Sequence, residues 1–157
     1  MNKRLIQSFI LCFIPDSGRR TRWLRDHHVF AHIGKKSIIR SRLVPLYAEL
    51  ITLGDNVRFA SNVHLITHDV CHMMLNNHPD YQGHKFKELK GPIVFGNNVF
   101  VGAHATILYN VTIGDNVIIG ANSLVNKDIP SNCVVGGVPA KVIGTFEDFV
   151  EKRKILE

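Results

Sequence analysis

An aliphatic or aromatic residue recurs at every sixth position from Phe95 to Val125, and this period constrains the fold more than any other feature of the sequence. The register divides into FGNNVF, VGAHAT, ILYNVT, IGDNVI, IGANSL and VNKDIP. The first position holds, in chain order, Phe95, Val101, Ile107, Ile113, Ile119 and Val125. An amphipathic helix repeats its apolar residues at intervals of three and four, and a half-buried strand alternates every two residues. Neither element explains a strict interval of six.

A six-residue period is typical of a parallel β-helix, in which each unit forms one short strand and a turn. Three units complete a triangular coil, and the leading side chain points into the interior and stacks on its equivalents in neighbouring coils. The fifth position is also apolar or small, with Val99, Ala105, Val111, Val117, Ser123 and Ile129. Glycine follows the leading residue in four units, at Gly96, Gly102, Gly114 and Gly120. Because Gly, Asn and Asp tolerate the backbone angles of tight turns, the sequence predicts an all-β coil around a column of Ile and Val.

The same period appears upstream and is interrupted once. Matching units begin at Ile33 (IGKKSI), Leu53 (LGDNVR) and Phe59 (FASNVH). Residues 69–92 break the pattern, because they are mostly polar, contain three histidines and have no aliphatic column. We expect a long loop that leaves one corner of the coil. Long loops in compact domains are usually functional or disordered, and a tolerated surface insertion is the alternative.

The chain is expected to form one domain over residues 1–157, with a helical segment at 1–29, the coil at 30–144 and a helix at 145–157. Ser17 is a candidate cap for a helix that extends to about His28, and Thr145 with Asp148 three residues on resembles a capping box. The apolar stretch near the N-terminus is too short to cross a bilayer, and no signal-peptide cleavage site follows it. We expect it to pack its apolar face on the coil or to contact a membrane surface.

Charge and cysteine content narrow the classes of partner and compartment. Residues 1–42 contain ten of the nineteen Lys and Arg residues but only two acidic residues, so the excess charge of +6 belongs to the N-terminal end. Such a surface suits an anionic substrate or membrane headgroups, unless it is simply a solvated face. It lacks the interleaved aromatics of a nucleic-acid platform, so no nucleic-acid partner is expected. Three widely spaced cysteines indicate neither a disulfide framework nor a zinc ribbon, which favours a reducing, cytoplasmic compartment.

His68 is the best catalytic candidate among nine histidines, because it ends a regular coil segment (NVHLITH) where the long loop begins. A histidine held by a rigid scaffold at that place suits acid–base chemistry near neutral pH, and a polar turn residue is the alternative. His68 and His72 have the spacing of a two-histidine metal motif but no clear third ligand, so we expect no metal. His104 occupies an outward-facing fourth position and is able to line a subunit interface.

The closing part of the coil resembles a known family. FGNNVF and residues 111–144, which contain NKDIP and GVPAK, closely resemble hexapeptide-repeat acetyltransferases, including maltose, galactoside, serine and polysaccharide O-acetyltransferases. Residues 45–70 resemble the polysaccharide and lipopolysaccharide members in particular, and the resemblance covers about residues 30–144. It implies a left-handed β-helix, although ordinary parallel crossovers are right-handed. It also implies acetyl transfer from acetyl-CoA to a carbohydrate hydroxyl in cell-envelope polysaccharide or lipopolysaccharide biosynthesis.

By this resemblance, His68 is the catalytic base. Small residues at Ala103 and Ala121 leave room for the pantetheine arm of the cofactor, and Lys127 and Lys141 contact its phosphates. Asn126 is also expected near the cofactor, at a position where many relatives have threonine.

The acceptor side departs from the sugar acetyltransferases. Arg40 stands where they carry asparagine, which argues against galactoside and maltose as acceptors, and Arg40 and Asp69 are expected to contact a different carbohydrate. Tyr109 and Asn110 replace a common Pro-Gly turn.

A single thin coil leaves flat faces that symmetric association can cover, so a homotrimer with shared active sites is expected. Two alternatives are a trimeric scaffold without catalysis and a γ-class carbonic anhydrase. The paired histidines of the second class have no counterpart here, since Tyr109 stands five residues after His104.

Overall fold

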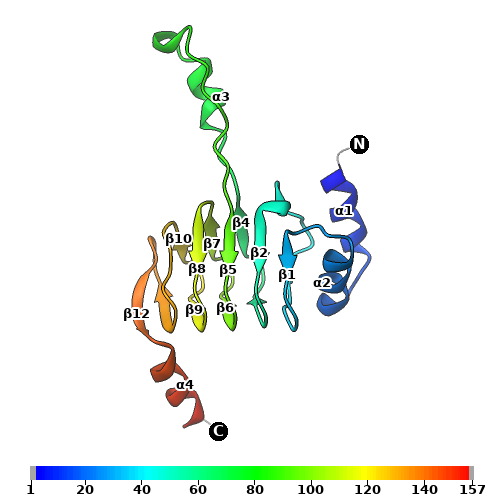
Figure 1. The fold of residues 1–157 in the computed structure, drawn as a ribbon, viewed down its shortest axis with the longest axis vertical. Coiled ribbons are helices and arrows are strands. Elements are labelled where there is room, and N and C mark those ends of the chain that lie inside the picture. Colours follow the sequence, from blue (N-terminus) through cyan, green and yellow to red (C-terminus); the bar gives the residue numbers. More distant parts are fainter. Residues whose placement is uncertain (1–2, 156–157) are drawn as a thin grey trace.

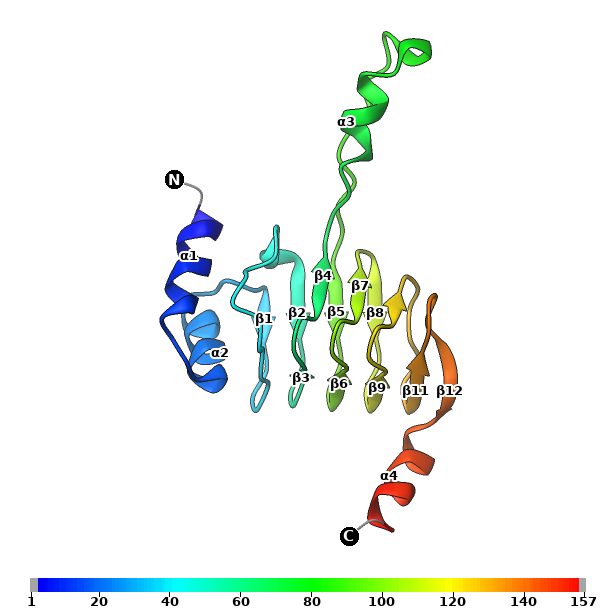
Figure 2. The same cartoon turned by 180° about the vertical axis from the view of Figure 1, so that it is seen from behind.

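The structure, a computed structural model, describes residues 3–155, and the outer ends of the two predicted terminal segments, 1–2 and 156–157, lie outside the described residues. Within this range, successive short strands go to three sheets in turn and form a three-sided coil (Figures 1 and 2). Sheet A consists of β1 (His32–Ile33), β2 (Ile51–Leu53), β5 (Ile93–Phe95) and β8 (Val111–Ile113). Sheet B consists of β3 (Arg58–Phe59), β6 (Val99–Val101), β9 (Val117–Ile119), β11 (Cys133–Gly136) and β12 (Lys141–Thr145). Sheet C consists of β4 (His64–Ile66), β7 (Thr106–Leu108) and β10 (Leu124–Val125).

The strands of successive coils pair in parallel, as the six-residue period predicts. Val99 pairs with Val117, and Ile107 pairs with Val125, so each coil takes three units of six residues. The exception is β12, which pairs antiparallel with β11 and ends the stack.

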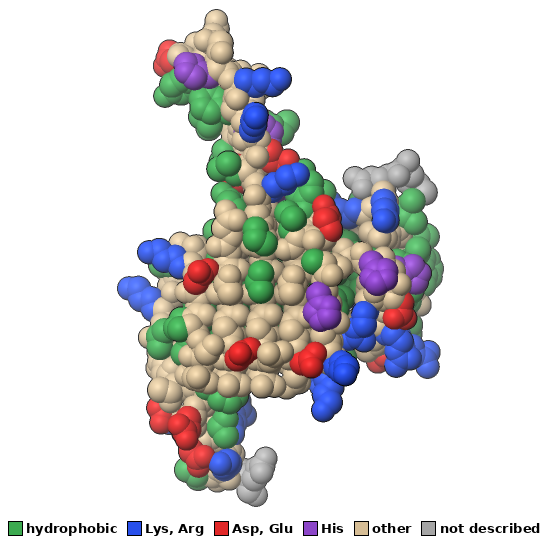
Figure 3. All heavy atoms as spheres, in the orientation of Figure 1, with side chains coloured by type: hydrophobic (Ala, Val, Ile, Leu, Met, Phe, Trp, Pro, Cys, Tyr) green, Lys and Arg blue, Asp and Glu red, His purple; other side chains and the backbone are tan. Residues whose placement is uncertain are grey.

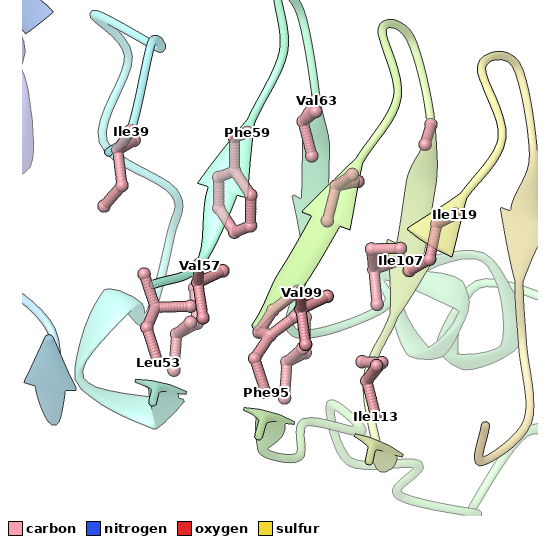
Figure 4. Close-up of a cluster of buried hydrophobic side chains, with 14 of the residues drawn as sticks. Ile39, Leu53, Val57, Phe59, Val63, Phe95, Val99, Ile107, Ile113 and Ile119 are labelled. Atoms are coloured by element: carbon pink, nitrogen blue, oxygen red, sulfur yellow. The ribbon is translucent and has the colours of Figure 1, made fainter. Parts of the chain in front are cut away.

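The predicted aliphatic column is confirmed. Every leading side chain from Phe95 to Val125 is at most 1% exposed, and the fifth-position side chains are buried beside them. Figure 4 shows these side chains converging between the sheets, with Phe59 and Phe95 in contact at a ring-centroid distance of 5.2 Å.

The turns between sheets define three edges of the coil, which we name by the sheets they join. The AB edge carries a ladder of asparagine amides, in which Asn98 donates to Asn116 and Asn116 donates to Asn132. Turn asparagines such as Asn98 and Asn116 have φ near +55°, and so does His104 (φ 59°) at the fourth position of its unit. This left-handed conformation explains the frequency of asparagine at that position.

Two helices cover the N-terminal end of the coil, and a third projects from the other end (Figure 1). At the N-terminal end, α1 (Lys3–Cys12) and α2 (Ser17–Asp26) lie beside β1, and α4 (Phe146–Lys154) follows β12 at the other end (Figure 1). Thr145 caps α4 by accepting from the Asp148 N–H, as predicted. For α2 the predicted cap is wrong by one residue, because the carboxylate of Asp16 accepts from Arg19. No helix among residues 3–155 is long and apolar enough to cross a membrane.

The apolar side of α1 does not pack on the coil. Its exposed large side chains are Leu5, Ile6, Phe9 and Ile10, while Ser8 and Leu11 face inward and are buried. Leu11 packs into the core, and polar contacts of Arg4 and Ser8 with Val44 complete the attachment of the helix. The expected packing of this segment on the coil is thus limited to Leu11, and most of its large apolar side chains stay exposed.

The interrupted segment forms an arm, residues 69–90, that projects from the CA edge (Figure 1). It is not a loop without secondary structure, because it contains α3 (Cys71–Asn76) and the 3₁₀ turn η2 (Pro79–Tyr81). No residue of the arm is buried. A second 3₁₀ turn, η1 (Ala48–Leu50), precedes β2 on the same edge.

Candidate active site

His68 lies directly beyond β4, at the point where the arm leaves the CA edge. It forms an antiparallel bridge with Lys90, so the outgoing and returning chains of the arm pair beside it. Two backbone hydrogen bonds join the two chains at the base of the arm. The Asp69 N–H donates to the Leu89 carbonyl, and the Gly91 N–H donates to the Thr67 carbonyl, both at 2.9 Å. The backbone at His68 is thus held by the arm as well as by the coil.

The His68 ring lies edge-on to Tyr47, with 5.5 Å between ring centroids. Lys90 places its ammonium 4.6 Å above the Tyr47 ring. The Tyr47 hydroxyl donates to Glu88 at 2.7 Å, and this hydrogen bond raises the pKa of Tyr47. The Nδ1 atom of His68 is buried and has no hydrogen-bond partner among the described residues.

Asp69 fixes the arm to the next coil. Its carboxylate accepts from the Tyr109 hydroxyl at 2.9 Å and from the Cys71 N–H at 3.1 Å. The first of these bonds raises the pKa of Tyr109, because the neutral hydroxyl is the donor. The predicted contact of Asp69 with the acceptor stays a prediction, since both observed bonds serve the arm.

A groove of about 530 Å³ opens beside His68, between α1 and β4. It forms where the first coil has no strand in sheet C, so residues 41–46 cross the end of that sheet as an irregular segment. Most of the lining is apolar, from residues such as Leu43 and Leu46. The polar side chains of the lining are Arg4, Ser41, Asn62, His64 and His68.

Ala103 and Ala121 stack on each other at the BC edge. The Asn122 N–H donates to the Ala103 carbonyl at 2.9 Å. A Cβ atom at Gly102 would lie 2.4 Å from the Ala121 backbone nitrogen, so only glycine fits there. These two alanines therefore form a strip of small residues on a closely packed edge.

The other predicted residues are distributed over the surface. Asn126 and Lys127 are exposed in the turn after β10, on the CA edge. Lys141 is exposed at the start of β12, where it pairs with Gly136. Arg40 is exposed and its carbonyl accepts from Arg20 at 3.2 Å, but it does not line the groove beside His68.

Comparison with known proteins identifies the family. The family model for the bacterial transferase hexapeptide (six repeats) matches residues 92–127. Galactoside O-acetyltransferase of Escherichia coli K12 is 42% identical over 119 residues, which are 74% of this chain and 55% of that protein. The structure of a galactoside acetyltransferase in complex with coenzyme A matches with a TM-score of 0.65 and 28% identity, over 95% of this chain and 83% of that one. The chain belongs to the hexapeptide-repeat acetyltransferase family.

Other members match a larger share of their own length. The putative acetyltransferase YvoF of Bacillus subtilis 168 is 28% identical over 157 residues, which are 96% of this chain and 83% of that protein. The chain spans only about half the length of the Escherichia coli relative.

In this member of the acetyltransferase family, one chain does not bring all the predicted site residues together. His68, Asp69, Asn126 and Lys127 lie on the CA edge, whereas Ala103 and Ala121 lie on the BC edge. The width of sheet C separates the two edges, and a three-residue strand spans about 10 Å. Among residues 3–155, no three His, Cys, Asp or Glu side chains are grouped so as to hold a metal ion.

Sequence reasoning missed the residues that surround His68. Tyr47 comes from the preceding coil, and Glu88 and Lys90 come from the returning half of the arm. These three have no motif of their own, because their proximity depends on how the arm pairs with itself. Tyr109 was recognisable in the sequence only as a departure from the usual Pro-Gly turn. The structure shows that its hydroxyl donates to the Asp69 carboxylate.

Proposed function

We propose that this chain is an acetyl-CoA-dependent O-acetyltransferase that acts on a carbohydrate hydroxyl, in the assembly of cell-envelope polysaccharide or lipopolysaccharide. The observation that carries the proposal is His68, which is held at the base of the arm and lines an open groove. Family membership supports the same reaction, and a structural relative is described as a complex with coenzyme A.

In this reaction, neutral His68 removes the proton from the acceptor hydroxyl, and the oxygen attacks the thioester carbonyl. Collapse of the tetrahedral species breaks the carbon–sulfur bond, and the CoA sulfur leaves with the proton that His68 had taken. The products are the acetyl ester and CoA, so no covalent enzyme intermediate is needed. Backbone N–H groups at Ala103 or Ala121 are the proposed donors to the oxyanion.

The separation of the two edges supports a site shared between chains. Within one chain, the proposed base and the proposed oxyanion donors lie on opposite sides of sheet C. In a cyclic homotrimer, the CA edge of one chain is able to face the BC edge of the next. We therefore propose a homotrimer with three intersubunit active sites. The left-handed winding of the coil is part of the same proposal.

The cofactor and acceptor contacts stay proposals as well. Lys127 and Lys141 are exposed point charges that suit the phosphates of acetyl-CoA, and Asn126 is adjacent to the first. Arg40 and Asp69 are the proposed contacts to the carbohydrate. The three cysteines form no disulfide with one another, which supports the cytoplasm as the proposed compartment.

The direct test has two parts. Calorimetric titration with acetyl-CoA should show saturable binding, and thiol release should rise above background when a panel of neutral, acidic and lipid-linked saccharides is added. Mass spectrometry should then find one added acetyl group on the accepting sugar. A chain that binds no acetyl-CoA would contradict the proposal and favour a scaffold without catalysis.

A further inference from the structure

The first helix presents its apolar side to the outside of the molecule. The large apolar side chains that are exposed along α1 and directly after it are Leu5, Ile6, Phe9, Ile10 and Phe13. Phe9 and Phe13 are 64% and 71% exposed and contact each other edge-on, with centroids 4.9 Å apart. A contiguous apolar surface of this kind on a folded protein usually marks an interaction site.

Polar contacts fix this orientation of α1. The Ser8 hydroxyl accepts from the Val44 N–H at 3.0 Å and donates to the Arg4 carbonyl at 2.9 Å. The Arg4 side chain donates through Nε to the Val44 carbonyl at 2.7 Å. Rotating the apolar side inward would break these bonds and bury polar groups without partners, which is costly. The outward apolar side is thus built into the attachment of the helix.

Basic side chains lie at the two ends of the apolar side. The sequence of α1 contains no acidic residue, and Lys3 at its first position is exposed. Beyond α1, Arg19 and Arg22 border a shallow hollow together with Phe13; the only acidic residue in the lining of that hollow is Asp26. Figure 3 shows hydrophobic side chains along the outer side of the N-terminal helices and Lys and Arg side chains below them.

We propose that this α1 face, defined by Leu5, Ile6, Phe9, Ile10 and Phe13, docks on an anionic lipid bilayer. A ten-residue helix is about 15 Å long, so it is able to lie in the interface but not to cross the bilayer. Buried apolar side chains together with cations that meet anionic headgroups are the two contributions that hold such helices at membranes. The positive charges of Lys3, Arg19 and Arg22 favour an anionic lipid surface over a second copy of the same face, because two copies would repel each other.

Docking in this way has a consequence for the groove beside His68. Arg4 and Leu11 line that groove from the inner side of the same helix, so a bilayer at the outer side of α1 lies one helix diameter, about 10 Å, from the groove. If the proposed function holds, the acceptor hydroxyl then belongs to a saccharide carried at the membrane.

The test is flotation of the full-length protein with lipid vesicles. At low salt, the protein should float with vesicles of phosphatidylcholine mixed with phosphatidylglycerol and not with pure phosphatidylcholine. Raising the salt should weaken binding, because screening acts on exposed charges. The double variant Phe9→Ser/Phe13→Ser should lose about tenfold or more of its vesicle affinity, because two large apolar contacts are removed.

A matched control removes two equally exposed apolar side chains elsewhere. Met73 and Met74 on the arm are 61% and 60% exposed, and Met73→Ser/Met74→Ser should bind vesicles like the unaltered chain. Equal binding by the two double variants would overturn the proposal, and so would failure of the unaltered protein to float at low salt. If Phe9→Ser/Phe13→Ser formed a smaller oligomer than the unaltered chain but floated equally well, the α1 face would be a contact between copies of the chain. That result would overturn lipid docking. Flotation needs neither acetyl-CoA nor catalysis, so its failure is distinguishable from failure of the proposed enzyme activity.

Discussion

The coil and the arm differ in how their side chains are held. Each leading side chain from Phe95 to Val125 is at most 1% exposed, whereas no residue of the arm, 69–90, is buried. In the coil, every position is supported by the same position one coil away, as when Ile107 pairs with Val125. The arm has no such neighbour within the chain. Side chains of the arm contact the coil at its base, through Asp69, Glu88 and Lys90.

This difference separates stability from chemistry. Burial along the column supplies the hydrophobic free energy of the fold, while the arm contributes little of it. His68 lies at the junction, where the coil fixes one side and the arm surrounds the other. The following changes test whether the two regions divide their roles in this way.

The largest effect is expected at the junction. His68→Ala should lower turnover by about two to four orders of magnitude, the usual loss for a general base, while affinity for acetyl-CoA changes little. Steady-state kinetics and calorimetry measure the two quantities. His32→Ala, which removes an exposed histidine of β1, is the control, and His104→Ala on the BC edge tests the other candidate base. If His68→Ala kept nearly full activity while His104→Ala lost it, the base would be His104.

The next effect concerns the column. Ile107 is fully buried, so Ile107→Ala should lower the free energy of unfolding by about 2–5 kcal/mol through lost burial and a cavity. Met74→Ala on the arm should change it by less than about 0.5 kcal/mol, because that side chain is exposed. Urea denaturation measures both. Equal losses would show that the arm is part of the folded core.

A smaller effect is expected at the exposed lysines. Lys127→Ala/Lys141→Ala should raise the apparent KM for acetyl-CoA by about tenfold and flatten the salt dependence of this KM. The KM for the acceptor should change little. Lys35→Ala/Lys36→Ala removes two exposed lysines from the AB edge and is the matched control. If the apparent KM for acetyl-CoA and its salt dependence were unaltered in Lys127→Ala/Lys141→Ala, these lysines would not be part of the cofactor site.

The smallest effect concerns the tyrosines at the base of the arm. The pKa values of Tyr47 and Tyr109 are raised above 10.0 by donation to Glu88 and Asp69, so the folded form holds its phenolic protons more tightly than the unfolded chain does. This contribution is fully present below pH 10 and is lost as the pH rises through the raised pKa values. Tyr109→Phe should speed hydrogen exchange of the Asp69 amide by about two- to tenfold, while the Gly102 amide is unchanged. Unchanged exchange at Asp69 would mean that Tyr109 does not hold the arm.

The coil was predictable from sequence because its environment repeats. Each leading aliphatic side chain meets the same surroundings, so the period of six marks parallel pairing, the column and the turn positions together. Even Thr145 was identified correctly as a cap, since capping depends on residues three positions apart. At α2, two candidate caps stood side by side, and Asp16 rather than Ser17 accepts the bond.

The arm and the surroundings of His68 were not predictable in the same way. No repeat fixes where the returning chain lies, so the positions of Glu88 and Lys90 depend on pairing across the arm. The short helix α3 has no apolar period and no side-chain cap from which it could be predicted. For α1, the sequence left two alternatives open, packing on the coil or contact with a membrane. Periodicity shows that one side of a helix is apolar, but it does not show what covers that side.

The central claim is that each active site combines His68 of one chain with the BC edge of the next, and mixed trimers test it most directly. The test uses His68→Ala and Ala121→Trp, where the bulky ring blocks the proposed path of the pantetheine arm; each variant alone should be inactive. When the two variants are co-expressed and mixed trimers are isolated, activity should recover to roughly one third of the unaltered level, because one of the three interfaces in each mixed trimer then pairs intact His68 with intact Ala121. Mixed oligomers without any recovery, or a fully active monomer by light scattering at assay concentration, would contradict a site shared between chains.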